Sequence, residues 1–105
     1  MSLHDLIMSL ISDITDPAVR LDIAATINFL KEVYLAGAAP EEEILNDLRE
    51  VCETVLAYKE PDLFGEELKR RAEELAKQMF RAIKIETMRL RMHRRLRPRF
   101  ARPPR

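Results

Sequence analysis

Apolar residues recur at intervals of three and four along most of this chain, and the pattern breaks at a few proline and glycine positions. Such spacing places apolar side chains on one face of an α-helix. The breaks occur at Asp16-Pro17, between Gly37 and Pro40, and between Pro61 and Gly65. Asp is a favoured N-cap, Pro suits the start of a helix, and Gly readily adopts the left-handed conformation that ends one. The sequence therefore predicts four helices, at about residues 2–15, 17–36, 40–58 and 65–95.

The predicted fold class is all-α, either a four-helix bundle or an antiparallel helical array with a long C-terminal helix. Short connections between the predicted helices favour antiparallel neighbours. Pro98 cannot donate a backbone hydrogen bond and is expected to stop the last helix. We therefore expect a helical domain over residues 1–96, followed by an extended, basic Arg/Pro-rich tail over residues 97–105.

The composition restricts where such a chain works. The 105 residues suffice for one domain, and the single cysteine excludes an internal disulfide, which favours a reducing, cytoplasmic compartment. No apolar run approaches the roughly 20 residues that span a bilayer, so no membrane partner is expected. Charged residues make up 34% of the chain and Gln, Asn and Cys are scarce, which is typical of proteins from thermophiles.

The net charge of zero hides a strong separation of charge along the chain. Residues 81–105, which we call the basic arm, contain ten Lys or Arg residues and one acid, a formal charge of +9. Residues 1–80, the acidic body, contain eight bases and seventeen acids, a formal charge of −9. An arm of this kind is expected to contact something acidic.

Arginine dominates the end of the basic arm, and arginine binds phosphate through paired hydrogen bonds and stacks on bases. An aromatic ring set among arginines is suited to stacking on an exposed base. The candidate nucleic-acid-binding residues are Arg89, Arg91, Arg94, Arg95, Arg97, Arg99, Phe100, Arg102 and Arg105. A competing interpretation is that the arm contacts acidic protein surface, on its own body or on a neighbour. DNA and RNA are not distinguished.

The last predicted helix carries a second apolar stripe, roughly opposite its core face. The stripe consists of Ile85, Met88, Met92 and Leu96, at spacings of three, four and four. A helix that is apolar on two faces is buried on two faces, and Met is common on adaptable contact surfaces. We interpret the apolar stripe as a protein interface, for a second copy or another protein. The alternative is that the helix bends, so that both stripes meet one core.

No recognised catalytic, metal or cofactor motif occurs in the sequence. Glu50 and Glu53 form an ExxE pair of the kind that binds Mg²⁺, but no matching acidic pair follows on the next helix, so a solvated face is the simpler interpretation. Cys52 falls on the apolar face of its helix and is expected to be a core residue. The sequence therefore predicts a non-enzymatic protein with no cofactor and no metal site.

Together these features predict a small accessory or assembly protein. In the favoured interpretation, the Arg-rich arm binds nucleic acid or a nucleoprotein while the helical domain docks on protein. In the alternative, the chain is a homo-oligomer or complex subunit whose arm contacts an acidic neighbouring bundle without nucleic acid.

Overall fold

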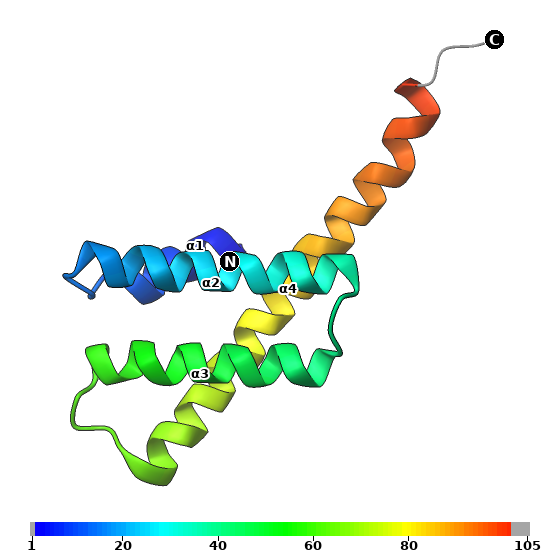
Figure 1. Ribbon diagram of the computed structural model, residues 1–105. Helices are drawn as coiled ribbons and strands as arrows, with labels where there is room; N and C mark the ends of the chain where they lie inside the picture. Colours follow the sequence, from blue (N-terminus) through cyan, green and yellow to red (C-terminus); the bar gives the residue numbers. More distant parts are fainter. Residues whose placement is uncertain (1, 102–105) are drawn as a thin grey trace.

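A computed structural model describes the backbone of residues 2–101 and the side chains of residues 2–92. These residues form four helices and no strand, which confirms the predicted all-α helical bundle. The helices are α1 (Leu3–Ile11), α2 (Pro17–Ala36), α3 (Glu41–Lys59) and α4 (Gly65–Ala101). The first three run back and forth, and α4 crosses them obliquely and projects beyond them (Figure 1).

Capping residues mark the start of α1 and both ends of α2. Ser2 Oγ accepts from the backbone N–H of Asp5 at the start of α1, and Asp16 accepts from Ala18 at the start of α2. Gly37 ends α2 in the left-handed region, with φ of 67°. Each of these groups satisfies backbone atoms that a helix end leaves without partners.

Helix α1 is shorter than predicted, because it ends at Ile11 and not near residue 15. The hydroxyl of Ser12 donates to the carbonyl of Ser9, and the backbone N–H of Ile14 donates to the carbonyl of Ile11 in the turn that follows. Ile14 nevertheless reaches the core from the turn that follows, and only 2% of its surface is exposed.

The core is continuous and lies between α4 and the other three helices. On α4, small residues alternate with large ones, so that α3 and α4 approach closely. The fully buried residues at this seam include Leu48, Cys52 and Val55 from α3 and Ala72, Ala76, Met79 and Ile83 from α4. Among the side chains described, up to residue 92, the buried positions of α4 end at Thr87 while the helix continues, so α4 projects beyond this seam.

Helix α4 extends to Ala101, beyond the predicted end near residue 95. Residues 97–101 are therefore helical and not the extended segment that Pro98 led us to expect. A proline inside a helix removes one backbone hydrogen bond, but the residues on either side can still be helical. The remainder of the predicted tail, residues 102–105, lies outside the described residues.

The projecting end of α4 gives the protein an elongated outline, 65 × 28 × 21 Å, and a radius of gyration of 16.4 Å. A compact domain of 100 residues has a radius of gyration of about 13 Å. We refer to residues 85–101 as distal α4. Within the described part of the chain, no helix is both long enough and apolar enough to cross a membrane.

Candidate functional site

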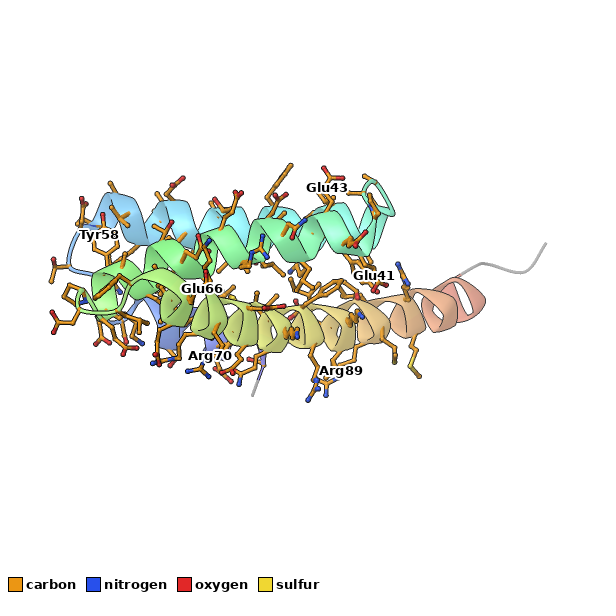
Figure 2. All side chains as sticks on the ribbon, turned by 90° about the horizontal axis from the view of Figure 1, so that it is seen from below. Glu41, Glu43, Tyr58, Glu66, Arg70 and Arg89 are labelled. Atoms are coloured by element: carbon orange, nitrogen blue, oxygen red, sulfur yellow. The ribbon has the colours of Figure 1, made fainter. Side chains whose placement is uncertain are left out.

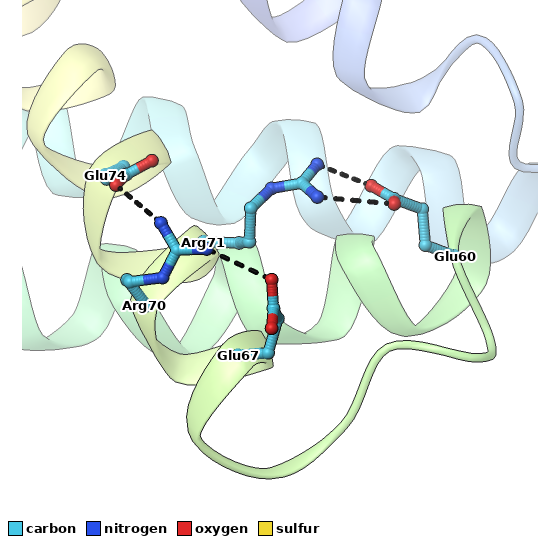
Figure 3. A network of polar contacts seen from close by, with 5 residues as sticks. All are labelled: Glu60, Glu67, Arg70, Arg71 and Glu74. Atoms are coloured by element: carbon cyan, nitrogen blue, oxygen red, sulfur yellow. Dashed lines mark hydrogen bonds and ion pairs between the residues drawn. The ribbon is translucent and has the colours of Figure 1, made fainter.

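Most basic side chains of the acidic body are neutralised by ion pairs. Near the start of α4, Arg71 donates to Glu60 through the two terminal nitrogens of its guanidinium, at 2.6 and 3.4 Å. Arg70 lies between Glu67 and Glu74, at 3.0 and 3.3 Å (Figure 3). These bases are therefore already committed to partners within the body.

The arginines of the basic arm are different. Arg81, Arg89 and Arg91 are exposed and form no ion pair with any other side chain among residues 2–92. Arg89 points away from α2 and α3, on the same side of α4 as Arg70, whereas Glu41 lies between α3 and α4 (Figure 2). The arm thus presents unneutralised guanidinium groups to solvent, and such groups are suited to binding phosphate or carboxylate.

Two ion pairs fix the root of distal α4 to the body. Lys84 Nζ lies 3.0 Å from Glu41 Oε1 at the start of α3, and Lys31 Nζ of α2 lies 3.2 Å from Glu86 Oε2. The second contact is close enough for an ion pair, although its angles do not satisfy a directed hydrogen bond, so Glu86 Oε2 is buried without one. Glu86 is the single acid of the basic arm, and its position shows that it joins the arm to α2.

An aromatic pair supports the same root. The rings of Tyr34 and Phe80 meet edge to face, with centroids 5.4 Å apart. The Lys84 ammonium lies 4.5 Å from the Phe80 centroid, and the Arg91 guanidinium lies 5.8 Å from the Tyr34 centroid. Cation–π contacts of this kind orient the charged group and leave its hydrogen-bond donors available. The sequence did not reveal this arrangement, because it joins residues of different helices.

The apolar stripe lies on the exposed side of distal α4. The exposed fractions of its described members are 46% for Ile85, 61% for Met88 and 57% for Met92. On the same side of the preceding turns α4 carries Glu67, Arg70 and Glu74, so this side changes from charged to apolar at Ile85. The three described members of the apolar stripe therefore do not join the core of their own chain.

Two grooves border the root of the apolar stripe. One lies beside the end of α2 and is lined by Tyr34, Lys84, Thr87, Met88, Arg91 and Met92. The other lies beside the start of α1 and is lined by Ser2, Leu3, Ala82, Ile85, Glu86 and Arg89. The stripe is thus a ridge between two hollows, which is a shape that a partner surface can receive.

The structure places the remaining predicted residues only in part. The backbones of Arg94, Arg95, Leu96, Arg97, Arg99 and Phe100 belong to α4, and their side chains lie outside the described residues. Arg102 and Arg105 lie outside them entirely. The predicted nucleic-acid-binding and protein-interface residues up to Ala101 thus share one projecting helix.

Cys52 is fully buried, which confirms its predicted place in the core, and its sulfur lies 3.7 Å from the Met79 sulfur. Burial, with a smaller contribution from the charge of Glu53, raises the pKa of Cys52 to about 12. The thiol is therefore protonated at neutral pH and is not a nucleophile there. Among the described residues, no group of three or more His, Cys, Asp or Glu side chains is arranged to hold a metal ion.

Comparison of the chain with protein-family models, with curated proteins and with solved structures gave no match.

Proposed function

We propose that this protein is a small helical accessory or assembly factor whose basic arm binds nucleic acid while its helical domain docks on protein. The observation that carries the proposal is the contrast between the two halves of α4. Arg70, Arg71 and Lys77 of the first half are paired with neighbouring acids, whereas Arg89 and Arg91 are exposed and unpaired among the described side chains.

The shape of the molecule supports contact through the arm alone. The acidic body is repelled by phosphate, and distal α4 projects away from it. A helix of 17 residues is about 25 Å long. That length lets the arm lie along a nucleic-acid backbone while the acidic body remains clear of it.

The apolar stripe supports the protein-docking half of the proposal. Phosphate and sugar are contacted by charged and polar groups, and a row of Ile and Met side chains offers none. A surface that combines unpaired arginines with exposed apolar groups fits two partners. If only a protein partner exists, the same arm serves as an adaptor between acidic protein surfaces, and the measurement below separates the two cases.

The test is a titration against generic duplex DNA and single-stranded RNA over a series of salt concentrations. Each phosphate contact contributes a slope of about 0.9 for a duplex, or about 0.7 for a single strand, to the fall of log affinity with log salt. Replacing Arg89 and Arg91 by Gln should make the slope shallower by about 1.8 for the duplex and about 1.4 for the single strand. The matched control replaces Arg70 and Lys77 by Gln. It removes the same charge from paired positions and should change the slope little.

Deletion of residues 94–105 removes six further arginines and should abolish binding at moderate salt. Binding that persists unchanged after this deletion, or no binding at low salt, contradicts the nucleic-acid half of the proposal. An equal effect of the arm and control variants would mean that only net charge matters.

A further inference from the structure

The outer side of α2 carries apolar residues that no neighbouring element covers. Leu21 and Phe29 have exposed fractions of 72% and 65%, and Ala25 lies exposed between them. Their spacing of four residues places them in one row along the helix. We call this row, with its flanking residues Asp22 and Glu32, the α2 outer face.

The charge of this face is opposite to that of distal α4. Asp22 and Glu32 are exposed beside the apolar row, and neither forms an ion pair with a described side chain. The basic residues of α2, Arg20 and Lys31, lie on the other side of the helix and are half-buried. The α2 outer face is thus apolar and acidic, as distal α4 is apolar and basic.

The two surfaces also match in length. Helix α2 has 20 residues and is about 30 Å long, while distal α4 has 17 residues and is about 25 Å long. Within one chain they do not meet through these faces, because the exposed residues of each point to solvent. A contact between them therefore requires two molecules.

We infer that distal α4 of one molecule docks on the α2 outer face of a second copy of the same chain. Ile85, Met88 and Met92 pack against Leu21, Ala25 and Phe29 of the neighbour, while the flanking arginines meet its Asp22 and Glu32. Pairing of two distal α4 helices with each other is the less favourable arrangement, because it brings two strongly basic segments together. The inference rests on the protein-docking half of the proposed function and names its partner.

The contact joins two different surfaces of the chain. Two molecules satisfy it by exchanging arms about a twofold axis, and more molecules satisfy it head to tail by forming a ring. In each case every copy has one arm to give and one α2 outer face to receive it. This asymmetry makes the inference testable by mixing variants.

The experiment measures molar mass by light scattering during size-exclusion chromatography, over a range of protein and salt concentrations. The wild-type protein should associate, and association should weaken as salt rises. Met88→Glu, which damages the arm, and Phe29→Glu, which damages the acceptor, should each weaken association at least about tenfold, as expected for an interface residue worth 1.4 kcal/mol or more. Both residues are exposed, so circular dichroism should show unchanged helix content.

A 1:1 mixture of the two variants is the decisive sample. The intact arm of the Phe29→Glu protein meets the intact acceptor of the Met88→Glu protein, so a species of twice the monomer mass should reappear. If Phe29→Glu associates like the wild type, or if mixing restores nothing, the inference is wrong. Leu21→Glu provides a second acceptor variant and should behave as Phe29→Glu does.

A wild-type protein that remains monomeric at every concentration also overturns the inference. The nucleic-acid titration is a separate measurement, so its result stands whichever way the mass measurement falls. A charge exchange gives an independent check. Asp22→Arg with Glu32→Arg should weaken association, and mixing that protein with an Arg89→Glu, Arg91→Glu protein should restore it.

Discussion

The claim that α4 has two functionally different apolar faces can be tested with two isoleucines that lie two residues apart. Ile83 is completely buried, whereas 46% of Ile85 is exposed. Both residues are in the same helix, so replacing each by Ala changes helix propensity equally. The difference between the two variants therefore reports burial alone.

The expected magnitudes follow from that burial. Ile to Ala removes three carbon groups, worth about 2.4 kcal/mol in transfer free energy when fully buried. The cavity left at Ile83 adds to this, so Ile83→Ala should lower the free energy of unfolding by about 2–5 kcal/mol. At Ile85 roughly half of the transfer term applies and no enclosed cavity forms, so the loss should be about 1 kcal/mol.

Urea denaturation followed by circular dichroism measures both losses. The protein should be dilute, so that association does not add to stability. Thermal midpoints should fall by about 10–30 °C for Ile83→Ala and by less than about 8 °C for Ile85→Ala. Comparable losses at the two positions would refute the two-face argument. They would mean that Ile85 packs in the same core and that the apolar stripe is not an interface.

Three further outcomes are expected. The Cys52 thiol should resist alkylation at neutral pH until the protein unfolds. The pKa of Cys52 is raised from about 9 to about 12 by burial, so the stability that the protonated thiol contributes is complete below pH 9 and is lost as the pH rises from there toward 12. Denaturation of the wild type and of Cys52→Ala over a series of pH values measures this loss. Gly37→Ala should lower the free energy of unfolding by about 1–2 kcal/mol, because an alanine is strained at the φ of 67° that Gly37 adopts. No clash adds to this cost, since no atom lies within 4 Å of the added methyl group. An unchanged free energy of unfolding in urea denaturation would contradict the prediction. Pro98→Ala should leave the helix content measured by circular dichroism nearly unchanged, because residues 97–101 are already helical. A clear rise in helix content would mean that Pro98 ends the helix, since Pro is about 3 kcal/mol less favourable than Ala inside a helix.

The sequence predicted the number of helices and most of their bounds, because caps and breaks are local signals. Asp16-Pro17 and Gly37 act through backbone atoms within a few residues of themselves. The errors came at two helix ends. Helix α1 ends at Ile11 and the chain turns, with Ile14 buried beyond the turn, and Pro98 did not end α4.

Which side chains of α4 are buried was harder to predict than the position of the helix. Thr87 is polar, yet only 1% of it is exposed, because its hydroxyl donates to the carbonyl oxygen of Ile83 and lies 3.1 Å from that of Lys84 within the same helix. Leu90 follows the buried Ile83 by seven residues and so lies on the same face of the helix, yet it is 36% exposed because α4 has by then passed the edge of the body. The phase of a helix identifies its apolar faces, but the positions of neighbouring helices decide where each face is covered.

The same reasoning explains why the apolar stripe could be predicted and the α2 outer face could not. The apolar stripe lies opposite the core face of α4, so one helix cannot direct both faces to the same interior. On α2, Leu21 and Phe29 are separated by small and polar residues, and such isolated apolar residues are common on protein surfaces. Their significance emerges only once the structure shows that both are exposed, that they lie in one row, and that the flanking charges are acidic. The α2 outer face would not stand out by itself. It becomes a candidate interface because distal α4 of the same molecule is basic and of similar length, and because its apolar stripe also lacks a partner among the described residues.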